Sequence, residues 1–134
     1  MPDKEIIGGR VTWGDMVVPL SWAVRAGDTI YVSGMVAMKD NQPCFDGDIA
    51  VQTRLAMTFM RGILEEAECT FQDIVKVSVF LKNRSDFAGF NSTYAEYFPD
   101  EPPARFTICT GFMHEDCLIE FDATAYSPRT SVKT

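Results

Sequence analysis

The chain has 134 residues, the size of one ordinary domain, and apolar residues make up 46% of it, enough to fill a core. Its net charge is −7, from 19 acidic and 12 basic residues, whereas a protein that binds a phosphate backbone normally presents a basic surface. Composition therefore predicts a single soluble domain over residues 1–134 and disfavours nucleic-acid binding.

The N-terminus and the cysteines indicate where such a protein works. Residues 1–5 lack the basic and apolar pattern of a signal peptide, and no apolar run approaches the ~18 residues of a membrane span. The chain has no C-x-x-C pair and one histidine, His114, so a zinc site is disfavoured. We expect a cytoplasmic protein with reduced cysteines, no metal and no membrane partner.

The first half of the chain predicts a strand followed by a long helix. Residues 29–36 are rich in strand-forming side chains and follow a turn signal at residues 26–28. Asp48 can cap a helix, because its carboxylate accepts free backbone N–H groups. We expect the helix to run to about residue 68 with one apolar stripe, formed by Val51, Leu55, Phe59, Ile63 and Ala67.

The second half predicts a strand, a helix and two more strands. Residues 74–81 alternate, with Val75, Val77, Val79 and Leu81 on one face. A second helix is expected from residue 85 or 86 through residue 98, before a proline-rich connection. Strands at residues 104–110 and 117–125 and a loose tail from about Ser127 complete an α+β domain, with both helices on one face of a mixed sheet.

The last two strands are predicted to pair as a hairpin. On this interpretation Phe106 and Ile108 lie under the helices, and Arg105 lies nearly opposite Glu120 on the face without helices. The pair is then either an exposed cross-strand salt bridge, worth ~0–1 kcal/mol, or a carboxylate-binding site. In such a site Arg105 clamps an anion and Glu120 handles a proton. Patterning leaves both interpretations open.

Three motifs stand out in the first two-thirds of the chain. Residues 23–34 read AVRAGDTIYVSG, an A-x-x-x-G-x-x-x-x-x-S-G pattern, and Gln52 stands near the start of the predicted long helix. Residues 73–82 read DIVKVSVFLK and cover the predicted central strand.

Two further motifs lie nearer the C-terminus. After Asp86-Phe87, the second helix reads N-x-x-Y-x-x-Y-F over residues 91–98, and Pro103-Ala104-Arg105 precedes Ile119-Glu120. Over roughly residues 5–127, these stretches together resemble the Rid (YjgF) family, the reactive intermediate deaminases.

The resemblance implies a chorismate-mutase-like α+β fold and a homotrimer with a sheet-lined central barrel and clefts between subunits. It also implies hydrolysis of enamines and imines, such as 2-aminoacrylate, to the 2-keto acid and ammonia without a cofactor. Arg105 would hold the substrate carboxylate with a two-pronged hydrogen bond. Glu120 would position or deprotonate water. The other site residues so implied are Thr107, Ser33, Gly34, Asn91 and Leu20.

Three positions depart from the family pattern. Thr107 stands where many imine-hydrolysing members have Cys, and Leu20 stands where a Tyr is common. His114 replaces the usual Pro of the last turn and is expected to be a solvated loop residue. Loss of the tyrosine hydroxyl enlarges or dries the pocket, which favours a larger or more apolar imino acid than 2-aminoacrylate.

Other functions compete with the deaminase. A non-catalytic sensor of small carboxylates would use the same cleft without turnover. A translation inhibitor or endoribonuclease is disfavoured by the acidic charge and by the lack of a histidine pair. The sequence says nothing of a chaperone-like holdase. We expect the partners to be a carboxylate-bearing imine or enamine and further copies of the same chain.

Overall fold

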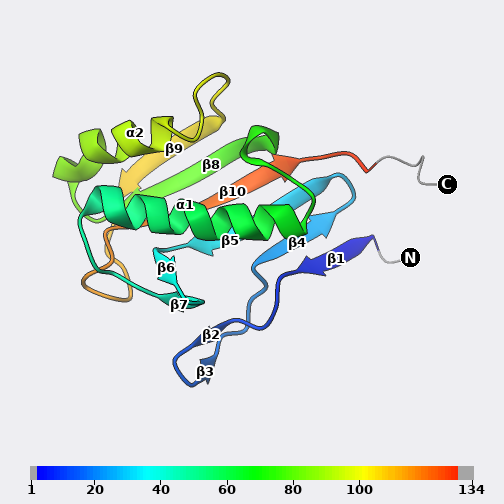
Figure 1. Ribbon diagram of the computed structural model, residues 1–134, viewed down its shortest axis with the longest axis horizontal. Helices are drawn as coiled ribbons and strands as arrows, with labels where there is room; N and C mark the ends of the chain where they lie inside the picture. Colours follow the sequence, from blue (N-terminus) through cyan, green and yellow to red (C-terminus); the bar gives the residue numbers. More distant parts are fainter. Residues whose placement is uncertain (1–2, 130–134) are drawn as a thin grey trace.

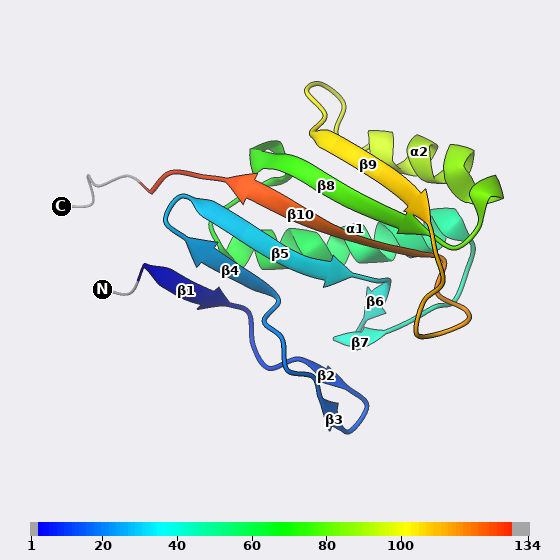
Figure 2. The same cartoon turned by 180° about the vertical axis from the view of Figure 1, so that it is seen from behind.

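The computed structural model describes residues 3–129 as a six-stranded sheet with both helices on one face (Figures 1 and 2). This confirms the predicted α+β class with a mixed sheet. The helices are α1 (Ile49–Glu66) and α2 (Phe87–Ala95). The sheet contains β1 (Lys4–Ile7), β4 (Ala23–Ala26), β5 (Thr29–Met35), β8 (Ile74–Leu81), β9 (Ala104–Cys109) and β10 (Ile119–Tyr126).

Smaller elements connect these parts. Two short hairpins lie beyond the sheet, β2 (Thr12–Trp13) with β3 (Met16–Val17) and β6 (Met38–Lys39) with β7 (Gln42–Pro43). Single turns of 3₁₀ helix, η1 (Phe71–Asp73) and η2 (Arg84–Asp86), precede β8 and α2. No helix within residues 3–129 has the length and apolar character needed to cross a membrane.

The strand order is β1-β4-β5-β10-β8-β9, and only β8 and β9 run parallel. The predicted pairing of the last two strands is therefore wrong, because β8 lies between β9 and β10. The chain leaves β8, forms α2 and returns as β9, and such a crossover connects parallel strands. The segment from residue 110 to 118 then carries the chain back to β10, in the middle of the sheet.

Helix α1 begins as predicted and buries a different stripe. The Asp48 carboxylate accepts the N–H of Val51 at 3.1 Å. Val51 itself is exposed, while the core side includes Gln52, Met57 and Met60. The buried amide of Gln52 is accommodated because it is hydrogen-bonded, and this turns the helix away from the purely apolar stripe that its sequence suggests.

Strand β8 also differs from simple alternation. Val75 is 50% exposed, although Val77, Val79 and Leu81 are buried as predicted. The pairing with β10 shifts register between Thr124 and Ala125, and this bulge turns Val75 outward. Helix α2 ends at Ala95, three residues earlier than expected, yet Phe98 remains in the core.

A buried arginine connects α1 to the far end of the sheet. The Arg25 guanidinium donates to the carbonyls of Ala67, Ser127 and Gly27 at 3.0, 2.9 and 3.1 Å. The Ser127 N–H in turn donates to the carbonyl of Asp28 at 2.8 Å. The start of the expected loose tail is thus hydrogen-bonded, and the rest of that tail, residues 130–134, lies outside the described residues.

Candidate active site

The strand registers decide which face each predicted site residue occupies. Arg105 pairs with Val77, which pairs with Ala123, and both of these partners are buried under the helices. Glu120 pairs with Phe80 and lies on the opposite, open face. Arg105 and Glu120 of one chain therefore lie on opposite faces of the sheet, and the predicted cross-strand pair is wrong.

The cause of this error is the strand order. The prediction counted alternation across a β9–β10 hairpin, whereas parallel pairing with β8 places the other set of β9 side chains under the helices. Phe106 and Ile108, expected in the core, are 45% and 48% exposed on the open face. The ring of Phe106 packs edge-on against Phe80, with the ring centroids 6.0 Å apart.

Arg105 lies against three aromatic rings of α2. Its guanidinium carbon is 5.9, 5.1 and 5.0 Å from the ring centroids of Phe87, Phe90 and Tyr94. The ion pairs within residues 3–129, Arg54–Glu96 and Arg129–Glu5, do not include it. Aromatic faces attract a guanidinium but accept none of its five N–H donors in the plane, so this cation can bind an outside anion.

Two hydroxyls near this arginine also lack partners. Tyr94 Oη and Thr107 Oγ1 are buried and make no hydrogen bond to any described residue. Burial raises the pKa of Tyr94 to about 12, although the nearby Arg105 cation acts to lower it. The Tyr94 hydroxyl therefore keeps its proton. Buried polar groups without partners are uncommon in proteins. Their position beside Arg105 indicates a place for a polar ligand.

Asn91 belongs to the same group of residues. It lies four residues after Phe87 and three before Tyr94, and residues at these spacings share one side of a helix. Asn91, Tyr94, Arg105 and Thr107 are called the α2–β9 cluster below. This cluster unites three of the predicted site residues at the edge of the sheet.

Glu120 lies in a separate pocket on the open side. It lines a cavity of about 190 Å³ together with Gly34 and Leu20, and its walls are otherwise mostly apolar. Burial raises the pKa of the Glu120 carboxyl, and the nearby Asp122 carboxylate raises it further. A carboxylate with a raised pKa is a stronger base for water than an ordinary surface glutamate.

A bulge in β5 makes room for the Glu120 side chain. Val32 pairs with Ala123 and Met35 with Phe121, so that two residues, Ser33 and Gly34, lie opposite Asp122 alone. A Cβ atom on Gly34 would collide with Glu120 Oε2. Glycine is therefore the residue that lets the carboxylate lie against the strand.

Ser33 has a supporting position in this pocket. Its hydroxyl donates to the carbonyl of Ser21 at 2.5 Å, and its N–H donates to the carbonyl of Trp22 at 2.9 Å. These bonds hold the segment that carries Leu20 against the bulge. Leu20, Ser33, Gly34 and Glu120 together are called the Glu120 pocket below.

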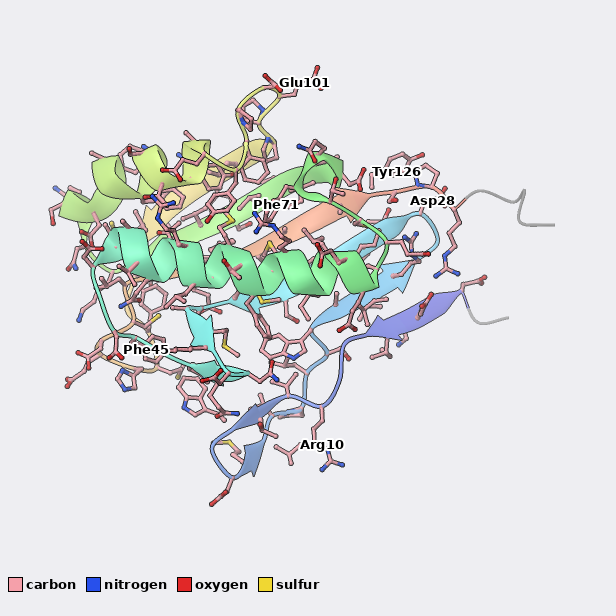
Figure 3. The ribbon with its side chains drawn as sticks, viewed as in Figure 1. Arg10, Asp28, Phe45, Phe71, Glu101 and Tyr126 are labelled. Atoms are coloured by element: carbon pink, nitrogen blue, oxygen red, sulfur yellow. The ribbon has the colours of Figure 1, made fainter. Side chains whose placement is uncertain are left out.

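Three rings, none of them among the predicted site residues, form one wall of this pocket. Trp13 and Phe45 have ring centroids 6.2 Å apart, and Phe45 and His114 have centroids 4.6 Å apart. Figure 3 shows Phe45 below the start of α1. His114 is exposed in a turn, as predicted, but it also stacks on Phe45 and lines the cavity.

Gln52 joins the two loops that carry Phe45 and His114. Its Nε2 donates to the carbonyls of Phe45 and Asp116 at 2.9 and 3.1 Å, and its Oε1 accepts the N–H of Leu118 at 3.0 Å. A polar residue on the buried side of an amphipathic helix was the available signal, because a buried amide must find partners outside the helix.

A larger hollow of about 780 Å³ lies between α1 and the β6–β7 hairpin. It contains none of the predicted site residues. Its charged side chains, Arg10, Lys39, Asp40 and Glu66, are two of each sign and are all exposed. The smaller Glu120 pocket, with its half-buried carboxylate, is the better candidate for chemistry.

Comparison with known proteins agrees with this fold. The model of the family described as Endoribonuclease L-PSP matches residues 15–127. A RutC family protein of Pyrococcus abyssi is 38% identical over 109 residues, which are 81% of this chain and 86% of the relative. The 3-aminoacrylate deaminase RutC of Acinetobacter baylyi is 34% identical over 111 residues, 82% of this chain and 88% of that protein.

Solved structures show the same architecture. Yeast Mmf1 superposes with a TM-score of 0.81 at 28% identity and covers 92% of this chain and 98% of its own. The YjgF gene product of E. coli gives a TM-score of 0.78 at 28% identity, with 91% and 98% covered. The chain has the YjgF fold and belongs to the Endoribonuclease L-PSP family, the YjgF/RutC/Rid group that its sequence motifs resemble.

Proposed function

We propose that this protein hydrolyses enamines and imines that carry a carboxylate, releasing a 2-keto acid and ammonia. The observation that carries the proposal is the half-buried Glu120 carboxylate, with its raised pKa, in an otherwise apolar pocket against Gly34. The Acinetobacter relative named as a 3-aminoacrylate deaminase supports the reaction class.

The chemistry requires only the substrate, one water and a proton carrier. Glu120 takes a proton from water while the water oxygen bonds to the imine carbon. Glu120 passes this proton to the imine nitrogen, which gives a carbinolamine. The proton of the new hydroxyl group then moves to the amino group through Glu120 as the C–N bond breaks, so ammonia leaves and the carbon becomes a carbonyl. An enamine first gains a proton on its β-carbon and loses one from its nitrogen, which makes it the imine. Arg105 holds the carboxylate of the substrate throughout.

The Glu120 pocket and the α2–β9 cluster belong to opposite faces, so we infer that a complete site forms between two copies of the chain. The cluster of one copy would supply Arg105, Asn91 and Thr107 to the Glu120 pocket of the next. In a homotrimer this contact would repeat three times, with the open sheet faces lining a central barrel. Exposed apolar side chains on that face support such burial, including Tyr31, Phe106 and Ile108.

The first test uses 2-aminoacrylate produced in a cuvette by a serine dehydratase. We expect the wild-type protein to accelerate keto-acid formation, and Glu120→Gln to abolish the acceleration. Glu96→Gln is the matched control, because it makes the same change at an exposed carboxylate in a surface ion pair. A folded wild-type protein without effect on any imine would contradict the deaminase and favour the non-catalytic sensor.

Subunit sharing is tested by mixing two inactive variants. In Arg105→Met the Glu120 pocket is intact, and in Glu120→Gln the α2–β9 cluster is intact. Unfolding and refolding them together at equal amounts should restore about one quarter of the sites, because random assembly pairs two intact halves that often. Recovery of no activity would show that each site is built within one chain.

The description of the matched family keeps RNA cleavage as a competing function. The net charge of −7 disfavours it, since affinity for RNA comes largely from lysine and arginine contacts to phosphate. We expect no salt-dependent binding of single-stranded RNA in a fluorescence anisotropy titration. Binding that weakens steeply with salt would reopen this function.

A further inference from the structure

The Glu120 pocket has a wall that the hydrolysis of a small enamine does not require. Trp13, Phe45 and His114 come from three separate segments, β2, the loop before α1 and the turn before β10. Their rings form a continuous series, with Phe45 between the other two. These three residues are called the aromatic wall below.

The aromatic wall is held in place by hydrogen bonds from outside it. The N–H of Gly14, next to Trp13, donates to Gln42 Oε1 at 2.9 Å, and Gln42 Nε2 donates to Thr12 Oγ1 at 3.0 Å. The β2–β3 hairpin is thereby tied to the β6–β7 hairpin. His114 Nδ1 accepts the N–H of Asp116 at 3.1 Å, which orients the imidazole ring.

The size of the cavity exceeds what a small substrate fills. It measures about 190 Å³, whereas an apolar protein cavity of ~150 Å³ is large enough to bind benzene. The methylene group of 2-aminoacrylate would leave most of the apolar walls in contact with water, so the free energy of burying that apolar surface would not be gained. A side chain with one aromatic ring fills the space and can pack against the rings.

Among residues 3–129, Glu120 is the only acidic or basic side chain, apart from the imidazole of His114, that lines the cavity. A substrate whose imine carbon lies at Glu120 would therefore direct an uncharged side chain toward the aromatic wall, because a second charge would be desolvated without a partner. At the opening, Met113 is 98% exposed and Leu20 is also exposed, which extends the apolar surface outward.

We propose, on the basis of the deaminase function above, that the preferred substrate is a 2-imino acid whose side chain ends in a single aromatic ring. The ring packs against Trp13 and Phe45, while the imine carbon lies at Glu120. The reaction is the same hydrolysis, and the side chain takes no chemical part in it. Specificity for the ring comes from the aromatic wall.

The test compares imines that an L-amino acid oxidase forms from phenylalanine and from alanine, with semicarbazide competing for each imine. We expect the wild-type kcat/KM to be about tenfold or more higher for the phenylalanine-derived imine. Trp13→Ala and Phe45→Leu should each lower this ratio about two- to tenfold. Met16→Ala is the matched control, since Met16 pairs with Trp13, is exposed and does not line the cavity.

The outcomes separate the two proposals. Faster turnover of the alanine-derived imine, or a ratio that neither variant changes, would overturn the aromatic preference and leave the deaminase intact. No turnover of either imine by folded protein would count against the deaminase itself. Titrations of 3-phenylpyruvate and of pyruvate, monitored by tryptophan fluorescence, would then test the aromatic preference. Binding of phenylpyruvate no tighter than that of pyruvate would overturn the preference. Tighter binding of phenylpyruvate would support it.

Discussion

Two arginines lie on the helix-covered side of the sheet, Arg25 on β4 and Arg105 on β9. The groups that contact each guanidinium indicate that Arg25 has a structural role and Arg105 a functional one. Arg25 is 4% exposed, and three backbone carbonyls accept its hydrogen bonds. Arg105 is half-buried against aromatic rings that accept no ordinary hydrogen bond. Within residues 3–129, backbone carbonyls bind both terminal nitrogens of Arg25, although its buried Nε has no partner, whereas Arg105 has no such acceptors. Residue type alone does not make this distinction.

The largest expected effects come from removing each arginine. Arg105→Met should lower kcat/KM about 100-fold, because the substrate carboxylate loses its charged partner, with little change in stability. Arg25→Met should destabilise the fold by about 2–4 kcal/mol, since buried carbonyls lose their donor. Urea denaturation and imine hydrolysis, measured on both variants, check this contrast. Equal losses of stability in Arg105→Met and Arg25→Met would contradict the assignment of different roles to the two arginines.

The glycine at the β5 bulge should show an intermediate effect. In Gly34→Ala the new methyl group displaces Glu120, so we expect about a tenfold loss of turnover and about 1–3 kcal/mol of destabilisation. Gly62→Ala is the control, because a Cβ there has no atom within 4 Å and alanine favours a helix by about 0.5–1 kcal/mol. The two Gly→Ala changes should thus shift the thermal midpoint in opposite directions.

The smallest effect concerns the pH dependence of stability at Glu120. Its folded pKa is raised by burial, so the folded state binds a proton more tightly than the unfolded state. Ionisation of Glu120 therefore costs stability as the pH rises from the ordinary glutamate value of 4.5 through the raised value. Glu120→Gln should be more stable than wild type at neutral pH, and the difference should vanish below pH 4.5, as urea denaturation can measure.

Turnover should increase with pH over the range in which the stability contribution of Glu120 decreases. The basic form of Glu120 is the active one, so kcat/KM should rise with pH through the raised pKa. A rate profile that stays flat between pH 4.5 and neutrality would mean that another group takes the proton from water.

The sequence predicted the parts of the fold that depend on neighbours along the chain. Asp48 caps α1 because an N-cap needs only the first turn of its own helix. Alternation correctly predicted that Val77, Val79 and Leu81 lie in the core, because alternation depends only on neighbouring residues of the same strand. Errors arose at Val75 and Val51, where a bulge and a buried amide interrupt the simple period.

The motifs also indicated the family and brought Glu120, Gly34 and Leu20 to attention, and the structure places these three around one cavity. Asn91, Arg105 and Thr107 form the other group, at α2 and β9. Sequence spacing did not reveal that the two groups belong to opposite faces of the sheet.

By itself, then, the sequence determined the α+β class, family membership, both helices and four of the six strands of the main sheet, namely β5, β8, β9 and β10, whereas β1, β4 and the two short hairpins were not predicted. Only the tertiary structure decided that β10 lies between β5 and β8, that Arg105 is under α2, and that Trp13, Phe45 and His114 form one wall. Periodicity reports on a single element, whereas strand order and facing depend on contacts between residues far apart in the chain. One change of pairing partner moves a whole set of side chains to the other face.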